Sequence, residues 1–408
     1  MEKVRLGLIG YGQRGKVLTE GSMIFMEDIE ICGVCDAYAD RAEEAAAYIE
    51  EKSGKRPFST TDYRDVLKLD IDAVIISAAW EAHVRIALDA MRAGKYVGLE
   101  VGGSYTIEDC WALVNTSEET GMPCMMLENC CYGKRELMVF NMVKKGVFGD
   151  VVYCEGGYGH DLREEISGGA ENRHYRLRNY THRNCENYPT HEIGPIAKIL
   201  DINNGNRMMT LTSLASKAKG LHEYVCQKKG EDSALAQTEF RQGDVVKTMI
   251  TCANGELITI TLDTTLPRTY SRNFSVRGTK AGYWEDNDSV FIDGQDNQYE
   301  FEGRKIWDSA KNYEEEYLHP LWRGFEPKGG HDGLDWLVIR AFVEAVKAGI
   351  QTPIDVYDTA SWMVISVLSE QSIAMGGAVQ AIPDFTRGYW MNRTDIPEQK
   401  YGLNRVYE

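Results

Sequence analysis

Residues 4–15, VRLGLIGYGQRG, decide the fold of this chain. The mostly apolar first half predicts a buried strand, and a helix expected over 13–26 follows it. Between them, Gly10, Gly12 and Gly15 stand in G-x-G-x-x-G spacing. Glycine permits a tight turn and a close backbone approach to a pyrophosphate, and the helix N-terminus offers it unpaired N–H groups. The stretch therefore predicts a dinucleotide site on a parallel sheet, unless the glycines serve only a tight turn.

Asp36 indicates which dinucleotide is expected. It follows a strand expected at 29–35 and stands about 20 residues beyond the last glycine, as in the dinucleotide-binding fingerprint. A carboxylate there accepts hydrogen bonds from the ribose hydroxyls of adenosine and repels a 2′-phosphate. We therefore expect NAD rather than NADP.

Short apolar strands alternate with amphipathic helices through the first third of the chain. Further buried strands are expected at 72–77, 96–100 and 123–127, with helices between them. This alternation is typical of a parallel sheet covered on both faces. It predicts an α/β class with a doubly wound Rossmann domain over residues 1–128.

The pattern changes beyond about residue 151. Long β-like stretches follow one another without regular helical crossovers, which predicts an α+β domain over 129–408 with a large, mostly antiparallel open sheet. Helices expected at 136–145, 335–347 and 357–375 would pack on one face of that sheet. An exposed face of this sheet makes a homo-oligomer, a dimer or tetramer, plausible.

Composition excludes several classes of protein. The 408 residues are 43% hydrophobic and 26% charged, which is ordinary for a globular chain. A net charge of −17 argues against nucleic acid and against an anionic membrane surface as partners. No apolar run approaches the length of about 18 residues that a membrane span needs. Ten scattered cysteines, one C-x-x-C without a second pair, and a strand that begins at once after Met1 favour reduced thiols in the cytoplasm and no metal site.

Residues just after the strands are the candidates for cofactor contacts, because ligands of open sheets lie beyond the carboxyl ends of the strands. Glu128 also stands at such an end; the alternative is that it is a structural partner of an arginine. For His83, the alternative is a solvated residue at a helix start. The candidate cofactor-binding residues are Gly10, Gly12, Gln13, Arg14, Gly15, Asp36, Trp80, His83, Glu100 and Asn129.

The second domain carries a polar, aromatic motif, YPTHEIGP at 188–195, preceded by HYRLRNY at 174–180. His191, near a helix start and beside Tyr188, is suited to moving a proton at neutral pH. The alternative is a structural histidine in a capped helix start. His331 is expected either at the mouth of a substrate site or as the cap of the helix that follows it.

These motifs resemble the Gfo/Idh/MocA group of sugar-handling, dinucleotide-dependent proteins. Within that group, the chain is similar to glycoside hydrolase family 109, the NAD-dependent α-N-acetylgalactosaminidase-type glycosidases. The strings that carry this resemblance are GYGQRG (10–15), WEAH (80–83), LENCCY (127–132), GGYGHDLR (156–163), HYRLRNY (174–180), YPTHEIGP (188–195), INNGNR (202–207), SKAKGLHEY (216–224) and IPDF (382–385).

The resemblance implies a glycosidase that borrows a hydride instead of using two carboxylates. The sugar is oxidised at carbon 3, the proton on carbon 2 is lost, the aglycone leaves, water adds, and the ketone is reduced again. His191 with Tyr188 would act at the carbon 3 hydroxyl, and Tyr158 at carbon 2 with Arg176 as its cationic neighbour. The implied catalytic residues are His191, Tyr158 and Tyr188, and the implied substrate-binding residues are Glu128, Arg176, Tyr270 and His160.

Two other functions stay open from the sequence. Glu100-Val101-Gly102 lacks the lysine that simple sugar dehydrogenases of the larger group place after this glutamate, which weakens but does not exclude an NAD-dependent sugar dehydrogenase that releases NADH. A non-catalytic sugar or nucleotide sensor is the third alternative. A small glycoside is the expected substrate.

Overall fold

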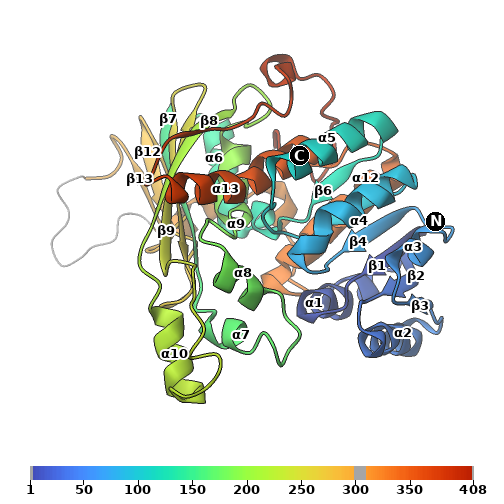
Figure 1. The fold of residues 1–408 in the computed structure, drawn as a ribbon. Helices are drawn as coiled ribbons and strands as arrows, with labels where there is room; N and C mark the ends of the chain where they lie inside the picture. The colour runs from blue at the N-terminus through green and yellow to red at the C-terminus, as the bar shows by residue number, and fades with distance from the viewer. Residues whose placement is uncertain (1–2, 298–308, 407–408) are drawn as a thin grey trace. The chain divides into compact units, whose positions relative to one another are not determined.

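A computed structural model describes residues 3–297 and 309–406 of the chain (Figure 1). Its internal contacts divide it into two compact units, and the first takes in parts of the chain that lie far apart in sequence. The first unit comprises Met1–Gly133, Pro320–Ala360 and Arg393–Glu408, and the second Lys134–His319 and Ser361–Asn392.

The first unit is built on a six-stranded parallel sheet in the order β3-β2-β1-β4-β5-β6. The strand order reverses between β1 and β4, and this switch point is where open α/β sheets bind ligands. The predicted doubly wound Rossmann architecture is confirmed. The strands are β1 (Val4–Ile9), β2 (Ile29–Cys35), β3 (Phe58–Thr60), β4 (Ala73–Ile76), β5 (Tyr96–Leu99) and β6 (Cys124–Met126).

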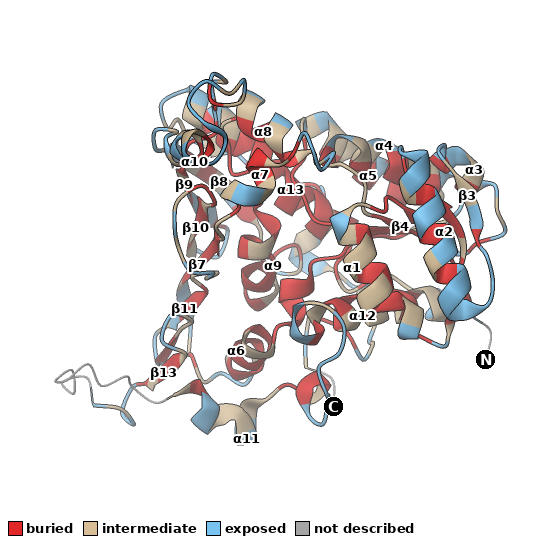
Figure 2. Cartoon of the chain, turned by 90° about the horizontal axis from the view of Figure 1, so that it is seen from below, coloured by how far each residue is buried: buried red, intermediate tan, exposed pale blue. Residues whose placement is uncertain are grey.

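Helices connect these strands and carry one apolar face each. In α2, for example, alanines and one isoleucine face the core while the opposite face is exposed (Figure 2). The helix predicted over 13–26 is shorter than expected: α1 ends at Gly21, because Gly21 and Ser22 are weak helix formers, and a 3-10 turn follows at Met23–Phe25. The main helices of this unit are α1 (Gln13–Gly21), α2 (Ala39–Ser53), α3 (Tyr63–Leu67), α4 (Trp80–Arg92), α5 (Ile107–Thr120) and α12 (Leu334–Ala348).

Helix α12 corrects one expectation. The helix predicted at 335–347 was assigned to the second sheet, but α12 belongs to the first unit and contacts β1 and the 3-10 turn Asn129–Tyr132. Its Arg340 guanidinium pairs with Asp28, at 2.6 Å, just before β2. An apolar periodicity predicts that a helix has a buried face but does not say which sheet it covers.

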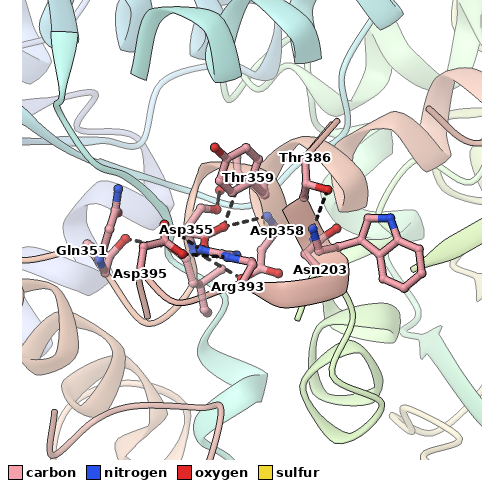
Figure 3. A network of polar contacts seen from close by, with 12 residues as sticks. Asn203, Gln351, Asp355, Asp358, Thr359, Thr386, Arg393 and Asp395 are labelled. Atoms are coloured by element: carbon pink, nitrogen blue, oxygen red, sulfur yellow. Dashed lines mark hydrogen bonds and ion pairs between the residues drawn. The ribbon is translucent and has the colours of Figure 1, made fainter. Parts of the chain in front are cut away.

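The last segment of the chain is held to the first unit by a buried cation. The Arg393 guanidinium lies 2.7 Å from an oxygen of Asp355 and 3.0 Å from one of Asp395, and its side chain is only 3% exposed (Figure 3). Arg393 also lies over the ring of Tyr357, with 5.1 Å between its Cζ and the ring centroid. A guanidinium buried with two carboxylates keeps its charge paired. This contact therefore holds the segment that begins at Arg393 to the rest of the first unit.

The second unit holds an eight-stranded sheet in the order β13-β12-β11-β7-β10-β9-β8-β14. Its neighbours pair antiparallel except β7 and β10, which run parallel with Tyr158 opposite Leu262. The predicted large, mostly antiparallel open sheet is confirmed. The strands are β7 (Val151–Gly159), β8 (Met208–Ala215), β9 (Val245–Cys252), β10 (Leu257–Asp263), β11 (Ser275–Gly278), β12 (Ala281–Trp284), β13 (Ser289–Ile292) and β14 (Gln380–Ala381).

Helix α9 packs closely on this sheet and is buried over most of its length (Figure 2). A Cβ on Gly156 of β7 would lie 2.3 Å from the carbonyl oxygen of Glu192 on α9, so only glycine permits this approach. No helix within residues 3–297 and 309–406 is both long and apolar enough to cross a membrane. The longer helices of the unit are α6 (Lys134–Lys144), α9 (Thr190–Ile199), α10 (Gly220–Lys229) and most of α13 (Val356–Ala374), with the short α7 (Arg163–Ser167) and α8 (Arg176–His182) beside them.

Candidate functional site

The glycine turn after β1 is shaped for a nucleotide. Gly10 has a φ of +101°, and a Cβ there would lie 2.6 Å from the carbonyl oxygen of Ser77. A Cβ on Gly15 would lie 2.2 Å from the oxygen of Gly10, so both positions require glycine. At Gly12, by contrast, a Cβ would meet only a side-chain nitrogen of Arg41, at 3.7 Å. Gly12 also caps α1 without a side-chain hydrogen bond, which leaves open space and N–H groups for a phosphate.

Asp36 is held in place at the carboxyl end of β2. Its two carboxylate oxygens accept backbone N–H bonds from Tyr11, at 2.7 Å, and from Tyr38, at 3.0 Å. The residue is 7% exposed. Because each carboxylate oxygen has two lone pairs, both can still accept a hydrogen bond from a ribose hydroxyl. Asp36 therefore lies at the end of β2, as its sequence position indicates, and keeps acceptor capacity for a hydroxyl group.

Arg14, Glu100 and Asn129 are brought together by Asp335. Two Arg14 nitrogens donate to the two oxygens of Asp335, both at 2.9 Å, and the Asn129 amide donates to it at 2.8 Å. The Arg14 Nε lies 3.0 Å from Glu100, and the Nδ1 of His331 lies 2.8 Å from Asp335. Three candidate cofactor residues therefore belong to one charged network, in which His331 also takes part.

Burial and pairing set the charges of this network. Burial by itself would raise the pKa of Asp335, but the hydrogen bond with His331 and the Arg14 guanidinium outweigh it and lower this pKa well below its ordinary value. Burial raises the pKa of Glu100, and Arg14 opposes that rise. Asp335 was not among the residues that the sequence pointed to. Its only local signal was its place in the string HDGLD, at 331–335.

Of the three remaining cofactor candidates, Gln13 is the exposed first residue of α1, and the start of α4 places the other two in the core. Trp80 is 3% exposed, and its ring lies so close to Gly102 that a Cβ there would be 2.6 Å away. His83 is buried, not solvated, and its Nε2–H donates to the carbonyl of Ala78 at 2.9 Å. Burial lowers its pKa to about 4, so the imidazole is neutral and its Nδ1 is an acceptor. Among the residues that the structure describes, this buried Nδ1 has no hydrogen-bond partner, which fits a site that awaits a donor from a bound molecule.

Three candidate catalytic rings form one aromatic cluster in the second unit. Tyr158 of β7 stacks on Tyr188 with 4.4 Å between ring centroids, and His191 of α9 meets both rings edge-on, at 5.4 and 4.8 Å. His160 follows directly after the end of β7, and its Nδ1 is 3.1 Å from the Tyr158 hydroxyl. Tyr270, which is 52% exposed, packs edge-on against His160 at 5.2 Å. Residues from a strand, a helix and three loops thus meet in one place.

Arg176 supplies the positive charge of this cluster. Its guanidinium carbon lies 4.9 Å from the ring centroid of Tyr188, and its Nε is 2.6 Å from Glu165. Burial raises the pKa of Tyr158, and Arg176 opposes that rise, so the phenol is protonated at neutral pH. Burial, and then Arg176, lower the pKa of His160. A neutral His160 can accept the Tyr158 proton through Nδ1.

Of the seven predicted catalytic and substrate-binding residues, six lie together in the second unit. Glu128 lies in the first unit, where it is fully buried and accepts the backbone N–H of Cys130 at 3.0 Å. Glu165, the partner of Arg176, was missed, because nothing in its sequence neighbourhood marks it. The six are Tyr158, His160, Arg176, Tyr188, His191 and Tyr270.

The fold and the glycine turn define a class of protein. Residues 4–128 match the oxidoreductase family with an NAD-binding Rossmann fold, the Gfo/Idh/MocA class, so the first unit is of the type that binds a nicotinamide cofactor. Residues 132–392 match the C-terminal domain of glycosyl hydrolase 109. The chain belongs to glycosyl hydrolase family 109, as its motifs had indicated.

Full-length relatives agree with this assignment. The chain is 38% identical to an alpha-N-acetylgalactosaminidase of Tannerella forsythia over 417 aligned positions, covering 96% of this chain and 88% of the relative. It is 39% identical to a glycosyl hydrolase family 109 protein of Stenotrophomonas maltophilia, with 97% and 91% covered. The crystal structure of an NAD binding oxidoreductase from Klebsiella pneumoniae shares the fold, with a TM-score of 0.71, 14% identity and 94% and 99% covered.

Proposed function

We propose that this chain is an NAD-dependent glycoside hydrolase that acts by transient oxidation at sugar carbon 3, elimination of the aglycone, addition of water and re-reduction. Family membership supports the hydrolase. The observation that carries the mechanism is the Tyr158 hydroxyl facing a neutral His160 Nδ1 at 3.1 Å, within the same cluster as His191. Such a cluster is built to move protons between a sugar and imidazoles.

The first unit would hold the cofactor. The turn at Gly10, Gly12 and Gly15 and the N-terminus of α1 would bind its pyrophosphate, and Asp36 would bind the adenosine ribose and disfavour a 2′-phosphate. NAD is therefore the proposed dinucleotide. When bound, it supplies a hydride acceptor for the sugar and returns the hydride at the end of the cycle. His83 offers an unpaired acceptor for a donor group of that cofactor.

The second unit would handle the protons. His191 would take the proton of the carbon 3 hydroxyl, with Tyr188 fixing the plane of its ring. Tyr158 would remove the proton on carbon 2, a step for which its buried phenol must first lose its own proton. His160 accepts that proton, and the Arg176 charge stabilises the phenolate that results. Tyr270 and Glu128 would orient the sugar.

An α-N-acetylgalactosaminide is the first substrate to test, because the Tannerella relative is named for that activity. Purified enzyme is incubated with aryl α- and β-glycosides while aglycone release and NADH absorbance are followed together. Aglycone release without stoichiometric NADH, with solvent deuterium entering at carbon 2, is the expected result. Steady accumulation of NADH from free sugars would instead favour the alternative, an NAD-dependent sugar dehydrogenase.

Two further properties belong to the same proposal. The ten cysteines are all free thiols, which supports a reducing, cytoplasmic location. The outer face of β8 and β9 carries the exposed apolar residues Leu214 and Met249, 62% and 46% exposed, which supports association of this face in a homodimer or tetramer. Light scattering of the purified protein tests the second point: a monomer at micromolar concentration would contradict it.

A further inference from the structure

Two acidic side chains lie in the core directly behind the aromatic cluster. Glu186 belongs to the loop that leads into α9 and is fully buried, and Glu192 follows His191 on α9 and is 1% exposed. Their carboxyl groups contact each other. Neither residue has a part in the mechanism proposed above.

The pair connects the three elements that carry the candidate catalytic rings. Glu186 accepts the backbone N–H of Tyr188 at 3.4 Å, and its carboxyl group also meets the backbone of Leu262. Glu192 meets the backbone of Tyr158, which is the register partner of Leu262 in the β7–β10 pair. One carboxyl pair therefore touches the backbone of Tyr158 and Tyr188 and adjoins His191 in sequence.

The surroundings anchor the pair from two further sides. Ser369 of α13 accepts the N–H of Glu186 at 2.8 Å, and Ser366 donates to its carbonyl at 2.7 Å. The close approach of α9 to β7 at Gly156 keeps Glu192 against the strand backbone. Neither acid can therefore move away from the other without disturbing the packing of helix on sheet.

The chemistry of the contact requires a proton. Two carboxylates have only acceptor oxygens, so they bond to each other only when at least one of them is protonated. Two negative charges in contact in a dry interior would repel strongly, as in other carboxyl pairs that share one site. The titratable groups that face Glu186 are Tyr180 and Cys185, both of which have raised pKa values mainly through burial. Burial raises the pKa of Glu186 to about 8 and that of Glu192 well above its ordinary value.

We propose that Glu186 and Glu192 keep at least one proton between them at neutral pH and that this acid pair positions Tyr158, Tyr188 and His191. The protonation of this acid pair is a property of the folded chain and does not depend on the proposed function. The expected effect of the pair on the rate of turnover does rest on the proposed function. Both are positioning residues, because they are buried and contact the backbone of the segments that carry the rings.

Infrared difference spectroscopy tests the protonation of this acid pair. Wild-type protein is compared at pH 7 with the double variant Glu186→Gln, Glu192→Gln and with the control Glu223→Gln, an exposed glutamate of α10 in the same unit. The difference between wild type and double variant should contain the carbonyl band of at least one protonated acid, whereas the control should lack the acid band. Two carboxylate signals without an acid band would overturn the proposal. If the double variant does not fold, the wild type alone is titrated, and its acid band must lose intensity with a midpoint near pH 8.

A pH profile tests the positioning role. A glutamine keeps the shape and hydrogen bonds of a protonated glutamate, so Glu186→Gln should retain aglycone release at pH 7. Wild type should lose activity as Glu186 ionises above about pH 8, and Glu186→Gln should lack that loss. An alkaline limb that is identical in both would refute the positioning role. Absence of glycosidase activity in the wild type would refute the proposed function and leave the infrared result standing.

Discussion

Asp335→Asn should destabilise the first unit by about 3 kcal/mol, although asparagine has nearly the same shape as aspartate. The carboxylate of Asp335 is fully buried and accepts two hydrogen bonds from Arg14 and one each from Asn129 and His331, all between 2.8 and 2.9 Å. Removing one charge of a buried ion pair costs about 3–5 kcal/mol, because the other charge stays buried without compensation. Arg14 keeps a second partner in Glu100, at 3.0 Å, and asparagine keeps the shape. We therefore expect a loss at the low end, about 3 kcal/mol.

The assay is thermal unfolding followed by circular dichroism, with Asp332→Asn as the matched control. Asp332 is exposed and lies three residues away, so the control makes the same change of charge without touching the network. For a unit of this size, 3 kcal/mol corresponds to a fall in Tm of about 6–12 °C. A Tm for Asp335→Asn within experimental error of Asp332→Asn would refute the reasoning.

The pH dependence gives a second check with a definite sign. The pKa of Asp335 is lowered in the folded state from its ordinary value of 3.8, so its contribution is fully present above that pH and is lost as the pH falls further. The difference in stability between wild type and Asp335→Asn should therefore be constant from pH 7 down to about pH 5 and shrink below pH 3.8. A difference that grows on acidification would contradict the assignment of an ionised Asp335.

Three further predictions concern cofactor and substrate. Gly15→Ala should both lower Tm and abolish NAD binding, since its Cβ would lie 2.2 Å from a carbonyl oxygen, whereas Gly12→Ala, with open space around it, should keep Tm and lose only NAD affinity in calorimetric titration. Asp36→Ser should lower the ratio of NADP to NAD dissociation constants by about tenfold or more. The substitution removes the charged acceptor for the ribose hydroxyls and the repulsion of a 2′-phosphate, and a loss of about 1.4 kcal/mol is already tenfold. An unchanged ratio would remove Asp36 from the ribose site. Tyr158→Phe should stop deuterium exchange at carbon 2 while NADH still forms from bound sugar; exchange by Tyr158→Phe at the wild-type rate would exclude Tyr158 as the base. Because burial lowers the pKa of His160, exchange in the wild type should persist to below pH 6.5 and decline only at lower pH, as His160 protonates.

Local patterns in the sequence predicted much of the first unit. The glycine turn, the strand before it and Asp36 were all readable, because turn chemistry and strand periodicity act over a few neighbouring residues. The histidine and tyrosines of YPTHEIGP were marked by their residue types, and the family resemblance supplied Tyr158, Arg176 and Tyr270. The roles of these residues remain proposals, whereas their assembly into one cluster is a property of the structure.

What the sequence by itself determined is therefore the class of fold, the nucleotide-type turn and the membership of the chain in its family. Only the tertiary structure decided that α12 returns to the first sheet, so that Asp335 meets Arg14 across more than 300 positions of sequence. It also decided that Glu186 and Glu192 lie face to face behind Tyr158. The reason is physical: a local pattern says that a side chain is buried, but the partner that compensates its charge is chosen by which surfaces pack together, and that choice depends on the whole chain.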